Sequence, residues 1–136
     1  MTIILDASVA LAFVFGDEDS PLVQKTLAAL AESPAYVPYH WSFEVNNGLL
    51  MAIRRRRLAA NDAPMAQALL LGLPLIPDPL TVEQAWSSAF VLAQQFRLTS
   101  YDAAYLELAV RLDAPLATLD KGLSRAARAA GVTLFD

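Results

Sequence analysis

Short apolar runs alternate along this chain with longer stretches of mixed polarity. The first run, residues 3–5, ends directly in Asp6, and a later one, residues 115–119, ends in Asp120. Unbroken apolar runs of this length, bounded by proline or a carboxylate, are typical of buried strands. The pattern predicts short strands at residues 3–5, 35–37, 75–76, 115–119 and 132–135.

The intervals between these runs carry helical patterns with recognisable starts. Ser20 precedes Pro21, which is the usual order of an N-cap and a first helical residue. Asn61, Thr81 and Ser100 also suit helix starts. The predicted helices cover residues 21–32, 41–57, 62–71, 81–96, 101–112 and 121–130, and another begins near residue 7.

Strands that alternate with helices predict an α/β fold, in which helices cover both faces of a short, mainly parallel sheet. A chain of 136 residues is near the commonest size of one domain and can form one core. The sequence shows no internal repeat, low-complexity segment or linker. We therefore expect residues 1–136 to form a single domain.

The composition limits the classes of function. The chain has no cysteine, which excludes disulfides, thiolate metal sites and thiol nucleophiles and fits a reducing compartment. The N-terminus reaches Asp6 before an apolar signal segment could form, and the longest apolar stretch, residues 63–77, is short and interrupted by proline and glycine. We therefore expect a soluble, cytoplasmic protein.

Hydrophobicity and charge give two further expectations. Apolar residues make up 56% of the chain and the mean hydropathy is +0.40, so we expect a partner or a second copy to cover some apolar surface. The formal net charge is -4 and the pI is about 4.8, so the chain as a whole does not attract nucleic acid. Any phosphate binding must come from local clusters of arginine and lysine.

Four carboxylates occupy positions where functional groups gather in open parallel sheets. Asp6 and Asp120 each follow an apolar strand, and Glu44 and Asp102 lie in the first turns of predicted helices. Each position alone is explained equally well by helix capping or by the helix dipole. The set of four is the informative feature.

Four converging carboxylates would need a cation. Two of them about 5 Å apart repel by about 3 kcal/mol at an effective dielectric constant of 20. Mg²⁺ or Mn²⁺ relieves that repulsion, prefers oxygen ligands and can bridge phosphate oxygens, which indicates phosphodiester cleavage. The residues needed for other catalytic chemistries are largely missing. His40 is the only histidine and is interpreted as a structural or surface residue, and zinc binding is disfavoured. The sequence contains no glycine-rich phosphate-binding loop.

Four segments also resemble, in order, the motif blocks of the PIN-domain ribonucleases. They are Ile-Leu-Asp-Ala-Ser at residues 4–8, Glu-Val-Asn-Asn-Gly-Leu at 44–49, Tyr-Asp-Ala-Ala-Tyr-Leu-Glu-Leu-Ala at 101–109, and Leu-Ala-Thr-Leu-Asp-Lys at 116–121. The resemblance spans nearly the whole chain. It implies a three-layer α/β/α sandwich, usually homodimeric, with an acidic Mg²⁺ or Mn²⁺ pocket that hydrolyses RNA.

The resemblance also implies roles for individual residues. Asp6, Glu44 and Asp102 would hold the metal, with Asp120 completing the pocket, while Ser8, Asn47 and Thr118 would orient ligands or water. Water would attack phosphorus in line and leave a 5′-phosphate and a 3′-hydroxyl. The compact single domain further resembles the VapC toxins of toxin–antitoxin pairs, which implies a small DNA-binding antitoxin as partner.

Two basic groups are candidates for RNA contact. Arg54, Arg55, Arg56 and Arg57 form a run at the end of a predicted helix, where cations also complement the helix dipole. Lys121, Arg125 and Arg128 have helical spacing and share one face directly after Asp120. Aromatic residues such as Tyr39, Phe43 and Trp86 could stack on bases or dock a partner helix, although such residues are more often core.

Two rival interpretations remain open from the sequence. The first is a PIN-fold binding or scaffold protein with little catalytic activity. The second is an aspartate-phosphorylating domain: a haloacid-dehalogenase-like phosphatase would need an aspartate where Ser8 stands, and a receiver would use Asp78, which lies between Pro77 and Pro79.

Overall fold

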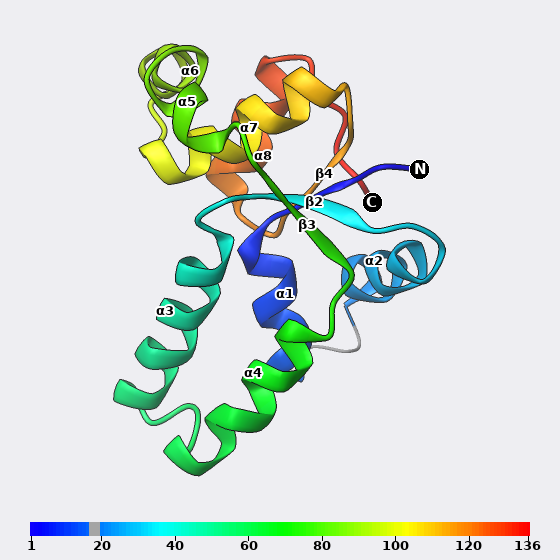
Figure 1. Cartoon of the computed structure of the whole chain (residues 1–136), viewed down its shortest axis with the longest axis vertical. Helices are drawn as coiled ribbons and strands as arrows, with labels where there is room; N and C mark the ends of the chain where they lie inside the picture. Colours follow the sequence, from blue (N-terminus) through cyan, green and yellow to red (C-terminus); the bar gives the residue numbers. More distant parts are fainter. Residues whose placement is uncertain (17–19) are drawn as a thin grey trace.

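The computed structural model describes residues 1–16 and 20–136. At its centre is a four-stranded sheet in the order β3–β2–β1–β4, and every pairing in it is parallel (Figure 1). This confirms the predicted α/β class with a parallel sheet. The strands are β1 (Ile4–Leu5), β2 (Ala35–Pro38), β3 (Leu75–Asp78) and β4 (Leu116–Ala117).

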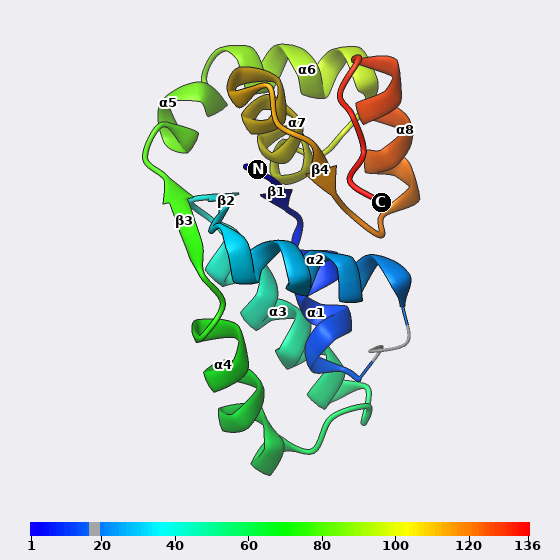
Figure 2. The same ribbon diagram turned by 90° about the vertical axis from the view of Figure 1, so that its right-hand side faces the viewer.

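Helices cover both faces of the sheet and make three layers (Figures 1 and 2). On one face α7 packs on β1, β2 and β4 and is itself contacted by α5, α6 and α8; on the other, α1 is contacted by α2, α3 and α4. No helix within residues 1–16 and 20–136 has the length and apolar character needed to cross a membrane. The helices are α1 (Ala7–Val14), α2 (Pro21–Glu32), α3 (Trp41–Arg54), α4 (Ala63–Leu71), α5 (Thr81–Ala85), α6 (Ser88–Phe96), α7 (Ser100–Leu112) and α8 (Lys121–Ala129), with a 3₁₀ turn at Ala60–Asp62.

The core is built where the sheet meets α1 and α7. Both residues of β1 and both of β4 are buried, because helices cover the sheet on two sides, and such strands are apolar throughout. Helix α7 is buried from Ala103 to Ala109. Helices α1 and α3 approach closely at Gly48, where a Cβ atom would lie only 2.5 Å from Cδ1 of Leu11.

Two predicted helices are shorter than expected. The predicted helix 41–57 ends at Arg54, because Arg56 takes a left-handed conformation and the N–H groups of Arg57 and Leu58 both donate to the carbonyl of Ala52. The predicted helix 81–96 is wrong as one element. It breaks into α5 and α6 where the backbone turns at Ser87 (φ −137°, ψ −101°).

Two further boundaries differ from the prediction. The predicted strand 132–135 is reduced to one parallel bridge, between Leu116 and Leu134. The N-cap of α7 is Thr99 rather than Ser100, since the Thr99 hydroxyl accepts a hydrogen bond from the N–H of Asp102 at 3.1 Å. That cap places Asp102 in the first turn of α7.

Candidate active site

The carboxyl ends of the strands gather the candidate side chains at one edge of the sheet. Asp6 directly follows β1, and Asp120 lies three residues after β4. Helix α3, which carries Glu44 in its first turn, begins three residues after β2. Because all the strands are parallel, these connections leave from the same edge.

Asp6 is held by two hydroxyl groups. Its side chain is buried, with 4% of the residue exposed, and its Oδ2 accepts hydrogen bonds from Ser8 Oγ at 2.6 Å and Thr118 Oγ1 at 2.7 Å. These hydroxyl oxygens in turn accept the backbone N–H groups of Leu119, at 2.9 Å, and Asp120, at 3.0 Å. Each hydroxyl has a single hydrogen and donates it to Asp6. The two hydrogen bonds therefore fix the orientation of the Asp6 carboxylate, which accepts both.

Helix capping explains one of the two strand-end aspartates. Oδ1 of Asp120 accepts the N–H of Leu123 at 2.8 Å, so this residue is the N-cap of α8. Asp6 occupies the N-cap position of α1, but its side chain makes no capping hydrogen bond. Asp6 is therefore committed to the side-chain network of the site rather than to its helix.

The pKa of Asp6 is raised above its ordinary value, chiefly because burial disfavours the charged form. The hydrogen bonds from Ser8 and Thr118 lower it, and the negative charges of Glu44 and Asp120 raise it further. Asp6 therefore interacts electrostatically with two of the other candidate acids, Glu44 and Asp120.

The pKa of Asp102 is raised to about 6, first by burial and then by the charges of Asp120, Asp6 and Glu44, while His40 lowers it. Each cause after burial is a nearby charge. The four carboxylates thus form one electrostatic unit, although they come from four separate parts of the chain.

His40 belongs to this unit, although the sequence suggested a structural or surface residue. Its Nε2 lies 2.7 Å from Glu44 Oε1, but the two atoms are not aligned for a hydrogen bond. Its ring meets Tyr101 and Tyr105 edge-on, at centroid distances of 5.6 and 5.7 Å. The signal that could have found it is the four-residue spacing from His40 to Glu44, which brings two side chains together at a helix start.

Tyr105 is a second residue that the sequence did not single out. It is fully buried in α7, and within the described part of the chain its hydroxyl lies near Glu44 and the backbone of Ala7 without a well-aligned hydrogen bond to either. Burial, followed by the charges of Glu44 and Asp6, raises its pKa well above the ordinary value. Glu44 Oε1 is likewise buried without a hydrogen bond, and unpaired buried polar atoms of this kind are commonly satisfied by water or an ion.

Asn47, the candidate for orienting ligands, and the basic residues that are candidates for RNA contact lie at different distances from the four acids. Asn47 is exposed and lines the same hollow as Glu44. Lys121, Arg125 and Arg128 are exposed on α8, which starts at Asp120, and they line a shallow hollow together. The structure thus gives α8 a basic face beside one of the acids.

The arginine run lies further away. Arg54, Arg55, Arg56 and Arg57 are all exposed, and the run begins ten residues after Glu44. At a rise of 1.5 Å per residue, that distance along α3 is about 15 Å. The guanidinium of Arg57 lies over the ring of Phe15, 5.8 Å from its centroid.

Asp78 is engaged elsewhere. Its oxygens accept hydrogen bonds from Arg111 Nη1 at 3.3 Å and Nη2 at 2.5 Å, and also from the Thr81 hydroxyl. Arg111 Nε in turn donates to Glu107 at 2.6 Å. A carboxylate bound in this way is not free to accept a phosphoryl group, which removes the support for a receiver-like role.

The donor set fits a hard divalent cation in its chemistry. The candidate ligands are all carboxylates, and after burial it is the charges of Glu44 and Asp120 that raise the pKa values of Asp6 and Asp102. Within residues 1–16 and 20–136, however, no three histidine, aspartate or glutamate side chains are arranged to hold a metal ion by themselves.

Comparison with known proteins identifies the family. Residues 3–129 match the PIN domain, so the chain belongs to the PIN-domain family. The crystal structure of PAE2754 from Pyrobaculum aerophilum is similar over 93% of this chain and 87% of that one, with a TM-score of 0.64 and 22% identity. No protein of curated function matches the sequence. PIN domains are generally nucleases that act on RNA and use divalent metal ions.

Burial and the repulsion among the acids together predict that Asp102→Asn stabilises the metal-free protein. The folded protein binds a proton at Asp102 up to about pH 6, against 3.8 for the unfolded chain, so stability falls as pH rises through that window. After discounting for the half-exposed position, we expect the variant to gain about 1 kcal/mol at pH 7, or about 4 °C in Tm.

Melting curves in EDTA at pH 7 and pH 5 test this prediction. The gain should shrink at pH 5, where Asp102 of the unsubstituted protein is mostly protonated. Asp62→Asn is the matched control, because Asp62 is exposed on the 3₁₀ turn and its side chain makes no capping bond. A Tm for Asp102→Asn at or below that of the unsubstituted protein at pH 7 would contradict the electrostatic interpretation.

Proposed function

We propose that the chain is a metal-dependent endoribonuclease that hydrolyses RNA phosphodiester bonds. The observation that carries this proposal is the set of mutually repelling carboxylates at the carboxyl edge of the sheet, centred on a buried Asp6 with two hydroxyl donors. Mutual repulsion of this kind is relieved by a divalent cation, which can also bind the phosphate oxygens of RNA.

In this proposal the residues of the chain take separate roles. Asp6, Glu44 and Asp102 are the residues that would hold Mg²⁺ or Mn²⁺, and Asp120 completes the pocket with the oxygen that its cap leaves free. When bound, the ion supplies charge to the phosphate oxygens and makes water acidic enough to attack at neutral pH. Ser8 and Thr118 keep Asp6 in place for it.

RNA contact is assigned to the basic groups. The face of α8 formed by Lys121, Arg125 and Arg128 lies beside Asp120 and would steer phosphates towards the acids. The run at residues 54–57 lies at the far end of α3 and would contact RNA only at a distance from the cleaved bond. Asn47 would orient a ligand from the wall of the hollow that contains Glu44.

The toxin role, the antitoxin partner and the homodimer rest on the resemblance to VapC toxins. The surface offers space for such partners, since large apolar side chains are exposed in two groups. One lies on α3 and α4 and the other on α5 and α6: Leu50, Met65, Leu69 and Leu71; Val82, Trp86, Phe90 and Val91. A partner that covers these side chains would explain why the chain contains more apolar residues than its own core buries.

The proposed function is tested by the ends that the protein leaves on RNA. Purified protein is incubated with total RNA and with a mixed set of oligoribonucleotides, in Mg²⁺, in Mn²⁺ and in EDTA. We expect cleavage only with metal, leaving 5′-phosphate and 3′-hydroxyl ends. Folded protein that cuts nothing under any condition would favour the binding or scaffold alternative, and cyclic phosphate ends would contradict the mechanism.

Thr118→Val should lower cleavage by about 10- to 100-fold and raise the metal concentration needed for half-maximal activity. The variant keeps the shape of Thr118 but removes a donor to Asp6 and the acceptor for the Asp120 N–H. Thr118→Ser should restore most of the activity, and Thr133→Val, at an exposed threonine, should have no effect. Equal metal dependence in the Thr118→Val and unsubstituted proteins would remove Thr118 from this role.

A further inference from the structure

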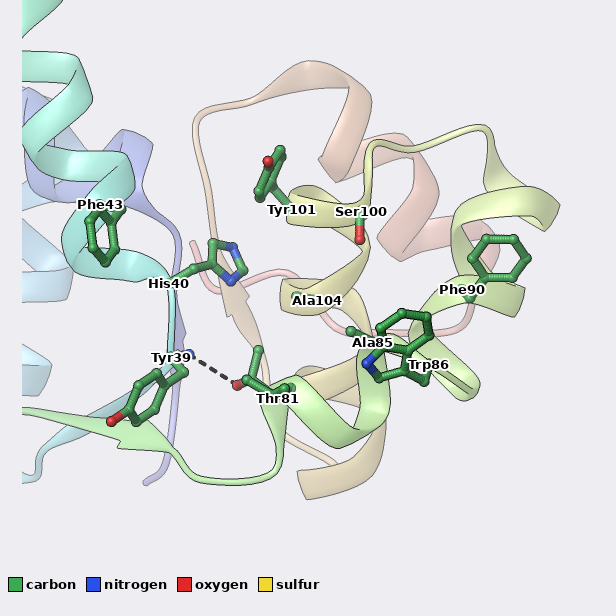
Figure 3. Close-up of a pocket in the computed structure, with 11 residues that line it drawn as sticks. Tyr39, His40, Phe43, Thr81, Ala85, Trp86, Phe90, Ser100, Tyr101 and Ala104 are labelled. Carbon is green, nitrogen blue, oxygen red and sulfur yellow. Dashed lines mark hydrogen bonds between the residues drawn. The ribbon is translucent and has the colours of Figure 1, made fainter.

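Each of two candidate acids is directly preceded by an exposed aromatic ring. Phe43 precedes Glu44 in the first turn of α3, and Tyr101 precedes Asp102 in the first turn of α7. The two rings are 81% and 63% exposed, although exposure of large apolar surface is unfavourable. Figure 3 shows them on either side of His40.

The rings stand where two hollows meet. A cavity of about 720 Å³, lined mostly by apolar side chains of α5, α6 and α7, contains Phe43, His40 and Tyr101 in its wall. A second one, of about 570 Å³, contains the same three residues together with Glu44 and Asn47. Phe43 and Tyr101 therefore border both an apolar cavity and the hollow that contains Glu44.

Neither hollow offers a fixed positive charge. Among the described residues, 1–16 and 20–136, no lysine or arginine lines either of them, and Glu44 is the only acid that does. A nucleic acid that approaches here gains nothing from pairing its phosphates with the wall. The uncharged face of a base, in contrast, stacks on an aromatic ring whatever its sequence.

We propose that Phe43 and Tyr101 bind an unpaired RNA base next to the cleaved phosphodiester bond by stacking on it. This inference rests on the proposed ribonuclease function and assigns two residues that would position the substrate there. Bases in a duplex hide their faces in the stack, whereas bases in loops and single strands expose them to aromatic side chains. Both rings are anchored in the first turn of a helix, so stacking orders little additional chain.

The position favours a base over an apolar protein partner. A partner that covered Phe43 and Tyr101 would also cover their neighbours Glu44 and Asp102, and burying unpaired carboxylates is costly. RNA approaches the same acids with its phosphate and the cations that accompany it. Trp86 and Phe90, in the wall of the larger cavity, do not border the hollow that contains Glu44, and they stay available for protein contacts.

Base stacking is measured directly with oligoribonucleotides that carry 2-aminopurine, whose fluorescence falls when it stacks. Binding is followed in EDTA and in Ca²⁺, with the probe placed in turn at each unpaired position. For the unsubstituted protein we expect quenching at a position next to the cut. Phe43→Leu and Tyr101→Leu should each weaken binding by about 5- to 150-fold and abolish that quenching.

Phe90→Leu is the matched control, because Phe90 is 59% exposed in the same cavity but does not border the hollow that contains Glu44. It should bind like the unsubstituted protein. Both test positions are exposed, and unchanged melting curves will verify that the variants fold. An oligoribonucleotide with an abasic site next to the cut should bind the unsubstituted protein and Phe43→Leu equally weakly.

The outcomes separate this inference from the proposed function. Metal-dependent cleavage with unchanged affinity and quenching in both leucine variants would overturn the stacking site and leave the nuclease standing. A change of oligomeric state in these variants without a change in RNA binding would assign the rings to a protein interface and overturn it too. If no unpaired RNA binds the unsubstituted protein, the stacking site is overturned, while the presence or absence of cleavage judges the nuclease independently.

Discussion

Asp6→Asn should lower RNA cleavage at least about a thousandfold, because the site loses a ligand charge worth several kcal/mol to the transition state. Asparagine keeps the shape and an oxygen that can accept from Ser8 and Thr118. The fold should therefore survive. The melting temperature in EDTA should rise, since burial and neighbouring acids raise the pKa of Asp6 and disfavour its charge.

The matched control for this variant is Asp113→Asn. Asp113 is exposed at the opposite end of α7 from Asp102, about 16 Å away along the helix. It should retain full activity, and its melting temperature in EDTA should rise by less than that of Asp6→Asn. Cleavage by Asp6→Asn at the rate of this control, in a preparation free of other nucleases, would exclude Asp6 from the active site.

Arg111→Met should destabilise the protein by about 3 to 5 kcal/mol. Arg111 neutralises two carboxylates that are almost fully buried, Asp78 at the end of β3 and Glu107 on α7. These acids raise the pKa of the guanidinium still further above its ordinary value. Removing the arginine leaves both charges buried without a cation to neutralise them, and urea unfolding monitored by circular dichroism measures the loss of stability.

Two comparisons show whether the buried charge is the cause. Arg128→Met, at an exposed arginine of α8, should change the free energy of unfolding by less than about 0.5 kcal/mol. Adding Asp78→Asn and Glu107→Gln to Arg111→Met should recover part of the lost stability, because the uncompensated charges are then gone. An Arg111→Met protein as stable as the Arg128→Met protein would show that the ion pairs contribute nothing.

The alternation of elements could be predicted because parallel strands buried on both faces are apolar throughout. Residues 3–5 and 115–119 carry that signal clearly. The break between α5 and α6 could not be predicted, since Trp86 and Ser87 include no glycine or proline to mark it. The left-handed Arg56 was equally hidden, because arginine ordinarily favours helix.

In the candidate site, contacts between residues close in sequence were easier to predict than contacts between residues far apart. The hydrogen bond from Ser8 to Asp6 joins near neighbours, whereas the one from Thr118 spans 112 positions and was expected only through the family resemblance. The four-residue spacing could have linked His40 to Glu44, whereas no pattern in the sequence links Tyr105 to it. Exposed Phe43 and buried Trp41 look alike in the sequence, because only packing decides which aromatic ring faces the core.

The most direct test of the central claim compares the unsubstituted protein and Asp6→Asn on one RNA substrate, each with Mg²⁺, with Mn²⁺ and with EDTA. Cleavage by the unsubstituted protein with either metal, and its loss both in EDTA and on Asp6 substitution, is the result that a metal-dependent acidic site predicts. Cleavage that persists in EDTA, or that is equal for the two proteins with metal, would contradict it.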